Sequence, residues 1–218
     1  MSKRSKVIVI ANSKGGPGKS TIACNLAVEA AREKKKVLLI DADEQQSSLN
    51  FRSARAENET LTQFQAVSIA KNTIHKDIGS FTDFDYIFID AGGRDSATLR
   101  SAILSARPLL LIPVLPSQYD IWATAKTIEI LEEARSLMDI KAVLLLNQVN
   151  RNTTIAKDAL EALQEFKLPI LDTEICQRIA FKRAITEGKG VSEYEPAGKA
   201  AAEIKNLWKE VKEIWKMK

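Results

Sequence analysis

The 218-residue sequence is short of the side chains that bind transition metals, since it contains two cysteines and one histidine. Cys24 and Cys176 show no metal-ligand spacing, and no cluster of cysteines or acids accompanies His75. We expect both cysteines to be small buried hydrophobic residues, and the histidine to be solvated or locally hydrogen-bonded. The composition gives no support to a metal site built from cysteine or histidine.

Long hydrophobic runs are also absent. No apolar stretch approaches the roughly 20 residues that a membrane-spanning helix needs. The start of the chain, MSKRSKVIVIANSKGG, leads into a glycine-rich loop and not to a cleavage site, so we expect a cytoplasmic protein. The net charge is only +4, so composition alone does not imply nucleic acid. With 45% hydrophobic residues, the chain is long enough for one sizeable core, and we expect residues 1–218 to form a single domain.

Apolar runs of strand length recur along the chain, at 6–11, 36–41, 86–90, 109–114 and 142–147. They are continuous, which is typical of strands covered on both faces in a parallel sheet. Segments with helical periodicity lie between or after them, at 20–34, 97–106, 119–137 and 154–166. The alternation predicts an α/β fold with a doubly wound, mostly parallel sheet and helices on both faces. Ligands of such sheets bind at the carboxyl ends of the strands. The stretch 52–79 shows no clear pattern.

A glycine-rich loop follows the first predicted strand. Residues 13–21 read SKGGPGKST, close to the P-loop pattern G-x-x-x-x-G-K-[ST], and a helix is predicted directly after them. Backbone N–H groups, the helix N-terminus and Lys19 would surround the phosphates, and the Ser20 hydroxyl would ligate Mg²⁺. Two features depart from the pattern: Ser13 replaces its first glycine, and Lys14 is an additional lysine. The predicted ATP-binding residues of this loop are Lys14, Gly15, Gly16, Pro17, Gly18, Lys19, Ser20 and Thr21.

Two acidic segments complete the predicted site. Asp90 ends the apolar run YIFID, where a Walker B carboxylate holds Mg²⁺. Asp41 and Asp43 lie in LLIDADEQQS, at the end of another predicted strand. Asp43 would reach the attacking water or the metal shell, while Asp41 is structural or supports the metal ligands. We predict Lys14, Lys19 and Asp43 as catalytic residues and Ser20, Asp43 and Asp90 as metal-binding residues. No glutamate follows Asp90, so we expect slow hydrolysis that depends on assembly.

Together these motifs resemble the deviant Walker A ATPases of the ParA/MinD type. KGGPGKST, DADEQQS and FDYIFIDAGG are similar to three nucleotide motifs of that family, and the resemblance runs from about residue 6 to 211. It implies ATP and Mg²⁺ as cofactors and a face-to-face ATP-dependent homodimer. It also implies that Lys14 contacts the partner subunit's nucleotide and that Asn147 helps to recognise adenine. The only alternative role for Lys14, which we expect to have no partner in its own chain, is that of a solvated charge.

Basic residues gather near the end of the chain. From 178 to 189 there are four cations and one acid, Glu187. The candidate DNA-binding residues are Arg178, Lys182, Arg183, Lys189 and Lys199. From about 197 to 218 we expect an amphipathic basic helix. Its apolar stripe is Ile204, Leu207, Trp208, Val211, Ile214 and Trp215, and its basic flank is Lys205, Lys209, Lys212 and Lys216.

Three interpretations of this last helix remain open. The stripe packs onto the sheet and exposes the lysines; or cations from both subunits of a dimer contact DNA phosphates; or the helix anchors the protein to a membrane. Glu203, Glu210 and Glu213 count against the membrane. The lack of a linker also counts against it.

The sequence thus predicts a ParA-like, nucleoid-associated ATPase that binds DNA nonspecifically and partitions or positions a plasmid, chromosome or protein cargo. A ParB-like centromere-binding protein or a cargo adaptor would stimulate its hydrolysis. The alternative is a MinD-like membrane-cycling ATPase that positions the division site. An iron protein like that of nitrogenase is not expected, because Cys24 cannot supply the cluster ligands at a dimer axis.

Overall fold

The computed structural model of the protein describes residues 4–93, 96–150, 153 and 155–215. In this part of the chain the strands form one parallel sheet with the order β3-β2-β4-β1-β5-β6-β7. The strands are β1 (Lys6–Ile10), β2 (Val37–Ala42), β3 (Gln65–Ser68), β4 (Tyr86–Ala91), β5 (Pro108–Val114), β6 (Lys141–Val149) and β7 (Ile175–Cys176). The predicted doubly wound parallel sheet is confirmed.

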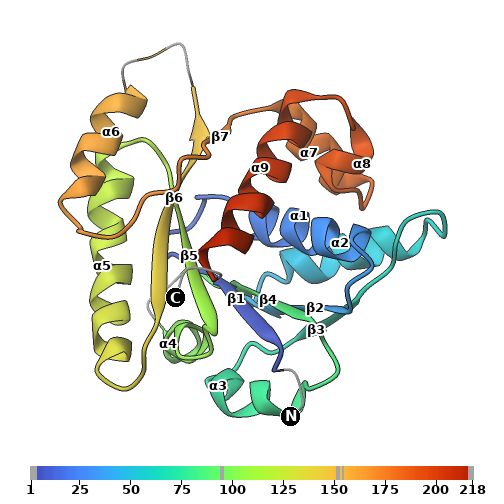
Figure 1. The fold of residues 1–218 in the computed structure, drawn as a ribbon, viewed down its shortest axis with the longest axis horizontal. Helices are drawn as coiled ribbons and strands as arrows, with labels where there is room; N and C mark the ends of the chain where they lie inside the picture. Colours follow the sequence, from blue (N-terminus) through green and yellow to red (C-terminus); the bar gives the residue numbers. More distant parts are fainter. Residues whose placement is uncertain (1–3, 94–95, 151–152, 154, 216–218) are drawn as a thin grey trace.

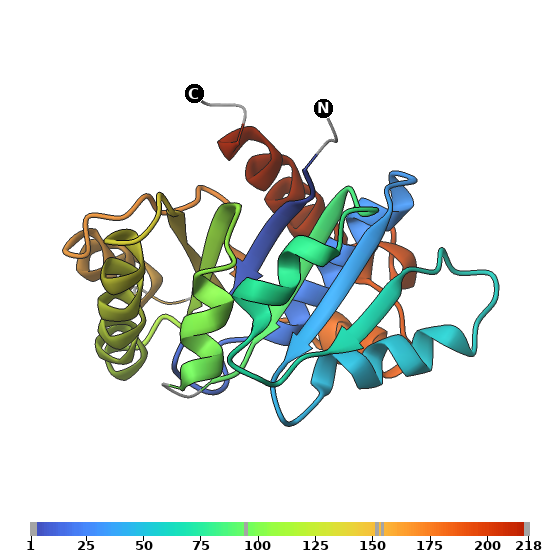
Figure 2. The same ribbon diagram turned by 90° about the horizontal axis from the view of Figure 1, so that it is seen from below.

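Helices cover both faces of the sheet (Figures 1 and 2). One face carries α3 (Ile74–Asp77), α4 (Ala97–Ile103), α5 (Gln118–Arg135) and α6 (Ile155–Gln164). The other carries α1 (Lys19–Arg32), α2 (Ser47–Ala56), α7 (Ile179–Thr186), α8 (Val191–Tyr194) and α9 (Lys199–Ile214). A short 3₁₀ helix, Ile78–Ser80, follows α3.

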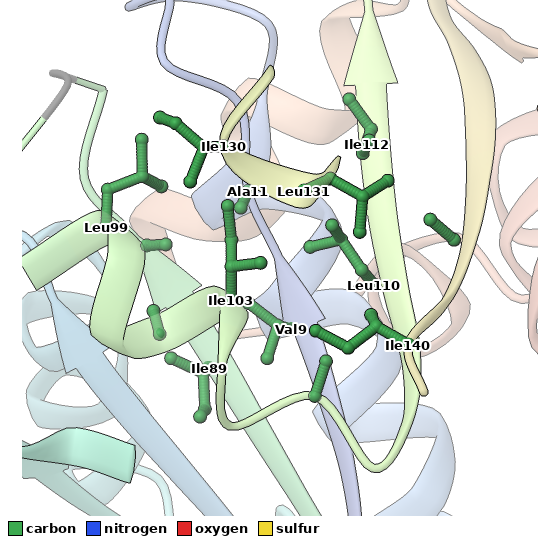
Figure 3. Packing of buried hydrophobic residues seen from close by; sticks show 14 of the residues in the cluster. Val9, Ala11, Ile89, Leu99, Ile103, Leu110, Ile112, Ile130, Leu131 and Ile140 are labelled. Carbon is green, nitrogen blue, oxygen red and sulfur yellow. The ribbon is translucent and has the colours of Figure 1, made fainter. Parts of the chain in front are cut away.

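Two apolar layers result, because successive residues of a strand point to opposite faces. In β1, Val7 and Val9 join the layer under α4 and α5, which Figure 3 shows from close by. Ile8 and Ile10 join the layer under α1 and α9. The central strands are apolar along most of their length because both of their faces are covered, and their polar residues lie near the strand ends.

The C-terminal helix α9 packs its apolar stripe into the second layer. Ile204, Leu207 and Val211 are buried, and the Trp208 ring meets the Tyr86 ring edge-on at 5.1 Å. The predicted packing of this stripe is confirmed, with Trp215 partly buried at its end. Lys216 of the predicted basic flank lies outside the described residues. No helix in the described ranges has the length and apolarity that crossing a membrane requires.

The predicted strands agree with the structure to within about two residues at most ends. The helix predicted at 154–166 is α6, which is described from Ile155; Thr154 lies outside the described residues. In the unreadable stretch 52–79 lie the end of α2, the edge strand β3 and α3. The sheet register places Asp41 of β2 beside Asp90 of β4, and Ile10 of β1 on the other side of Asp90. Asp90 therefore lies beside the strand that leads into the glycine-rich loop, and Asp41 lies one strand further from it.

Candidate active site

The glycine-rich loop between β1 and α1 takes a shape that only glycine adopts easily. Gly16 and Gly18 have φ of 95° and 83°, in the left-handed region. Two amides from the end of β6 hold the loop: Asn147 Nδ2 donates to the Pro17 carbonyl at 2.6 Å and Gln148 Nε2 to the Gly16 carbonyl at 3.1 Å. A Cβ on Gly18 would lie 2.4 Å from Asn147 Nδ2. Backbone conformation and close approach both require glycine here.

Helix α5 anchors the beginning of the loop through a buried polar network. Asn12 Nδ2 donates to the Pro113 carbonyl at 2.9 Å and to Thr124 Oγ1 at 3.2 Å. The backbone N–H of Ser13 donates to Thr127 Oγ1 at 2.8 Å. The Ser13 hydroxyl donates to the Ala123 carbonyl at 3.3 Å. This accounts for the first departure from the P-loop pattern, because the serine adds a bond to α5 that glycine could not make.

Lys19 lies folded into the loop that precedes it. Its side chain is buried, and Nζ donates to the Lys14 carbonyl at 2.8 Å. Burial lowers the pKa of Lys19, and the carboxylates of Asp90 and Asp43 oppose that shift. An ammonium group has three N–H donors, so this geometry leaves donors for an anion in the concave side of the loop. Lys19 is thus placed to neutralise a phosphate.

Asp90, at the end of β4, is the buried acid of the site. Its Oδ2 accepts a hydrogen bond from Ser48 Oγ at 2.5 Å, whereas its Oδ1 has no partner among the described residues. Burial raises the pKa of Asp90 to about 7, while the hydroxyls of Ser48 and Ser20 and the charge of Lys19 act in the opposite direction. A buried carboxylate oxygen without a donor needs a cation or a water as its partner. The Ser20 hydroxyl and Asp90 Oδ1 therefore fit Mg²⁺, which prefers few protein oxygens beside phosphate and water.

Asp41 and Asp43 have separate positions. Asp41 is fully buried, and its two oxygens accept the backbone N–H groups of Asp43 at 3.0 Å and Leu49 at 2.9 Å. Asp41 thereby fixes the turn between β2 and α2. Of the two roles considered for it, structural support or support of the metal ligands, these bonds favour the structural one. Asp43 is partly exposed, and its Oδ1 accepts the N–H of Gln45 at 3.0 Å. Its side chain lines the same cavity as Gly15, Lys19 and Ser20.

Among the cavities at the carboxyl ends of the strands, two adjoin each other at the glycine-rich loop. The larger, of about 460 Å³, is bounded by the phosphate loop, the start of α1, Asp43 and Gly93. The smaller, of about 140 Å³, lies beyond Gly18 and Asn147. Its other lining residues come from the start of α1, the end of β6, the β7 region and α7: Thr21, Gln148, Ile175, Cys176, Gln177, Arg178, Phe181, Lys182 and Ile185. The larger cavity has the donors for phosphates, and the smaller has the mixed apolar and amide lining that suits a nucleotide base.

The additional lysine, Lys14, does not lie alone as expected. Its Nζ is 3.6 Å from Asp120 Oδ1, with side-chain exposures of 43% for the lysine and 14% for the acid. The expectation that Lys14 has no partner in its own chain is wrong. No local pattern indicates this pair, because Asp120 belongs to the capped first turn of α5, far along the chain from the loop.

The candidate DNA-binding residues divide into paired and unpaired cations. Arg178 makes an ion pair with Glu203, with Nη2 2.5 Å from Oε1, and Lys189 Nζ lies 2.8 Å from Glu187 Oε2. Three further cations are exposed and make no ion pair within the described ranges: Lys182, Arg183 and Lys199. All five come from the region of α7, α8 and α9, on one face of the sheet (Figure 1).

Several residues of the site were not predicted. Asn12, Thr124 and Thr127 hold the loop, and Ser48 holds Asp90. Asn12 has a signal in the sequence, since it follows directly after a predicted strand. Ser48 has none, because its contact with Asp90 depends on how α2 packs.

The family to which these motifs belong is shown by comparison with known protein families. The CobQ/CobB/MinD/ParA nucleotide binding domain matches residues 8–191, from β1 to the start of α8. The chain belongs to this family. The resemblance to ParA/MinD-type proteins that the three motifs indicate is confirmed.

Individual relatives match almost the whole chain. The "Maintenance of carboxysome distribution protein A" of Halothiobacillus neapolitanus is 27% identical over 217 residues, which cover 96% of this chain and 98% of that protein. The structure of a single-residue variant of Cyanothece McdA in complex with ATP has a TM-score of 0.78 and 20% identity, covering 96% of this chain and 97% of that one. The septum site-determining protein MinD of Pyrococcus horikoshii, complexed with Mg-ADP, has a TM-score of 0.74 and 21% identity, covering 95% and 96%. The fold is therefore shared with these structures along nearly their whole length.

Proposed function

We propose that residues 1–218 act as one ParA-type ATPase domain that binds ATP with Mg²⁺ and uses it as a switch for dimerisation and DNA binding. The observation that carries this proposal is the buried Lys19, which lines the cavity at the glycine-rich loop and lies within electrostatic reach of the buried Asp90. The nucleotides in the solved structures of Cyanothece McdA and P. horikoshii MinD support it.

The phosphates would lie in the larger cavity. Backbone N–H groups of Gly15, Gly16 and Gly18 and the N-terminus of α1 face the phosphate oxygens, and Lys19 neutralises the β and γ phosphates. Thr21 donates to the α phosphate. Asn147 already holds the Pro17 carbonyl, and with the smaller cavity beside it this residue would face the adenine. Pro17 would contribute to the nucleotide site through its carbonyl, which fixes the Asn147 side chain.

Ser20 and Asp90 would hold Mg²⁺, and Asp43 would orient the attacking water or complete the metal shell. When bound, Mg²⁺ neutralises charge that develops on the phosphates during transfer. Asp43 is partly exposed and lines the larger cavity, whereas Asp41 is buried and accepts backbone N–H groups, so of these two acids Asp43 is the one available to water. Catalysis then depends on the arrangement of Lys14, Lys19 and Asp43 around the phosphates.

Dimerisation would depend on a contact between Lys14 of one subunit and the γ phosphate of the ATP bound to the other subunit. Two triphosphates brought face to face repel each other, and a lysine from each subunit reduces this repulsion. Lys14 is partly exposed and its in-chain partner is a single carboxylate, so its ammonium group can exchange that partner for a phosphate. A partner protein would stimulate hydrolysis and reverse the association.

DNA would be bound by the cations of α7 to α9 in the ATP-bound dimer. Dimerisation doubles the number of phosphate contacts, and the affinity rises steeply with that number through counterion release. Lys182, Arg183 and Lys199 are the exposed members of the group, while Arg178 and Lys189 have acidic neighbours. The protein would then associate with the nucleoid.

The cargo we favour is a protein assembly reached through an adaptor. The supporting observation is the full-length similarity to the carboxysome distribution protein of H. neapolitanus. A plasmid or chromosome held by a ParB-like protein is the other cargo of this class. A MinD-like membrane cycle would need a different membrane contact, because the apolar stripe of α9 is packed against the sheet.

Isothermal titration calorimetry with ATP and Mg²⁺ tests the nucleotide site. The wild type and Lys14→Ala should bind, Lys19→Ala should not, and Asp43→Ala should bind without turnover. Lys35→Ala is the matched control, since Lys35 is an exposed lysine in the turn between α1 and β2, away from the glycine-rich loop. Failure of the wild type to bind, or undiminished binding by Lys19→Ala, would contradict the proposal.

A further inference from the structure

Ser48 connects α2 to the buried acid of the active site. Its hydroxyl is fully buried and donates to Asp90 Oδ2 at 2.5 Å, and the thiol of Cys24 in α1 lies 3.5 Å from the same hydroxyl oxygen. Burial raises the pKa of Cys24, so the thiol keeps its proton. A protonated thiol can donate to Ser48, whose own proton is then directed to the carboxylate.

The hydrogen bond from Ser48 leaves one oxygen of Asp90 for another partner. Since Oδ2 is occupied by the hydroxyl, the carboxylate plane is fixed and Oδ1 stays buried and unpartnered within the described residues. A carboxylate that binds a cation through one oxygen is commonly held by a donor on the other. Ser48 occupies the position of that donor.

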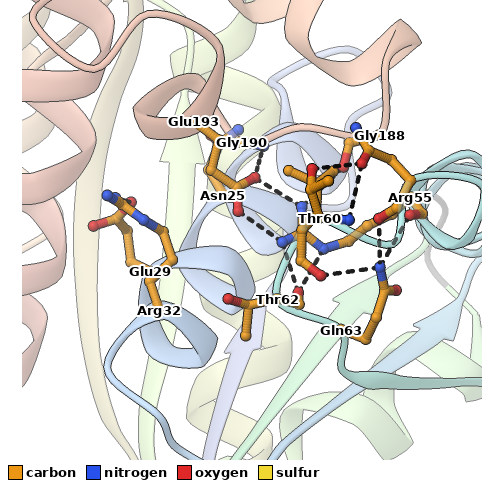
Figure 4. Close-up of polar contacts among 12 residues, drawn as sticks. Asn25, Glu29, Arg32, Arg55, Thr60, Thr62, Gln63, Gly188, Gly190 and Glu193 are labelled. Atoms are coloured by element: carbon orange, nitrogen blue, oxygen red, sulfur yellow. Dashed lines mark hydrogen bonds and ion pairs between the residues drawn. The ribbon is translucent and has the colours of Figure 1, made fainter.

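Hydrogen bonds and an ion pair hold both ends of α2, so the position of Ser48 relative to Asp90 is fixed. At the start of the helix, the Leu49 N–H donates to Asp41 Oδ2 at 2.9 Å. At the end, Arg55 is fully buried and makes a bidentate pair with Glu193 at 2.7 Å for both Nη atoms. Figure 4 shows Arg55 between the Thr62 segment and the Gly188–Glu193 turn. A helix fixed at both ends gives the hydroxyl a defined place.

Arg55 uses all of its donors in this position. Besides Glu193, it donates to the Thr62 carbonyl from Nε at 2.9 Å and Nη2 at 2.7 Å, and to the Gly188 carbonyl from Nη1 at 2.9 Å. Gly188 has φ of 63°, and a Cβ there would lie 2.3 Å from the Arg55 backbone N. The turn before α8 therefore closes directly on the end of α2.

We propose that Ser48 is a positioning residue for the metal carboxylate: it holds Asp90 Oδ2 so that Oδ1 faces the Mg²⁺ of a bound Mg-ATP. This inference rests on the proposed function, because it needs the nucleotide site to bind Mg-ATP. Ser48 itself touches neither nucleotide nor metal. Loss of the Ser48 hydroxyl should weaken the binding of Mg²⁺ more than the binding of the nucleotide, since Lys19 and the loop backbone would keep their contacts with the phosphates.

The test measures two binding quantities for each variant, using a fluorescent ATP analogue. One is the affinity for the nucleotide in EDTA, and the other is the Mg²⁺ concentration that gives half of the Mg-dependent rise in affinity. Ser48→Ala should raise the Mg²⁺ requirement about tenfold, as expected for one hydrogen bond to a charged group, and change the EDTA affinity less than about twofold. Ser53→Ala is the matched control, because this exposed serine of α2 donates to the Leu49 carbonyl of its own helix and, among the described residues, makes no contact with Asp90.

Two further variants separate positioning from a general structural role. Ser48→Thr keeps the hydroxyl and should restore a Mg²⁺ requirement within about threefold of wild type. Adding Ser48→Ala to Asp90→Ala should cause no further increase, because the carboxylate that Ser48 orients is gone. Thermal melting of each apo variant shows that it is folded.

The outcomes distinguish failure of the proposed role of Ser48 from failure of the proposed nucleotide-binding function. A wild type that binds Mg-ATP, with a Ser48→Ala variant that has an unchanged Mg²⁺ requirement, would overturn the role of Ser48 alone. Equally weakened binding in EDTA and in Mg²⁺ would overturn it as well, because that result indicates a damaged nucleotide site. A wild type that binds no nucleotide would overturn the proposed function, and this inference with it.

Discussion

The Nζ atom of Lys14 lies 3.6 Å from Oδ1 of Asp120, so the additional lysine of the phosphate loop is paired within its own chain. Asp120 belongs to the first turn of α5, where Ser117 caps the helix and its hydroxyl bonds the other oxygen of Asp120. The acid is therefore held in place while the lysine is not. The proposed ATP-bound dimer requires Lys14 to leave Asp120 for the partner's nucleotide.

Asp120→Asn should therefore strengthen ATP-dependent dimerisation about two- to fivefold. The change removes the in-chain attraction, and a pair this exposed contributes on the order of 0–1 kcal/mol. Lys14→Ala should still bind ATP but should fail to dimerise, and adding Asp120→Asn to it should change nothing. Sedimentation velocity with a non-hydrolysable ATP analogue measures all three. Equal dimerisation by wild type and Lys14→Ala would remove the role of Lys14 across the interface.

Arg55→Met should lower the free energy of unfolding by about 3–5 kcal/mol, because Glu193 is left as an unpaired, mostly buried charge. Arg32→Met is the matched control: Arg32 pairs with Glu29 in a partly exposed position, and its loss should cost at most about 1 kcal/mol. Urea denaturation followed by circular dichroism gives both values. A cost for Arg55→Met no larger than that of the control would contradict the assignment of a buried ion pair.

The Arg178–Glu203 pair should contribute to stability above about pH 4.5, the ordinary value for a glutamate. Burial alone would raise the pKa of Glu203, but hydrogen bonds from Arg178 and from the Cys176 N–H outweigh it and the net shift is downward. The folded pKa lies below the unfolded one, so this contribution is lost as the pH falls through the folded pKa. In Arg178→Met, acid unfolding should therefore begin at a higher pH than in the wild type. Superimposable stability curves across the acid range would refute the pair's contribution.

Features that depend on residues close together in the sequence could be predicted, whereas contacts between residues far apart in the sequence could not. The positions of the glycine-rich loop, of the strand ends and of Asp43 and Asp90 at those ends could be predicted from the sequence, because each depends on neighbouring residues. The parallel sheet followed from continuous apolar runs. The contact between Lys14 and Asp120 could not be predicted, because no sequence pattern indicates which of two distant charged residues form an ion pair.

The secondary structure of residues 52–79 was the hardest to predict, and there is a physical reason for this. Its edge strand β3 has only four residues, none of them fully buried, so the apolar signal is weak. Helix α2 is fixed by Arg55, a buried charge that resembles a surface residue in any hydropathy pattern. The importance of Ser48 likewise depends on its distance from Asp90 and not on its own neighbours.

Arg183→Ala and Lys199→Ala should each weaken binding to all DNA sequences alike. The slope of log affinity against log salt should become shallower by about one unit for each phosphate that the variant no longer neutralises. Lys157→Ala is the control, because this lysine lies on α6, across the sheet from α7 and α9. Fluorescence anisotropy over a salt series with two unrelated duplexes gives the slopes. An unchanged slope in both variants would place the DNA surface elsewhere.

The central claim is that ATP switches DNA binding on, and one measurement tests it most directly. Binding to a nonspecific duplex is measured at fixed moderate salt with ATP, with ADP and without nucleotide, for the wild type and Asp43→Ala. We predict binding only with ATP, and slower release from the variant because it does not turn the nucleotide over. Equal binding in all three nucleotide states, or none in any of them, would contradict the claim.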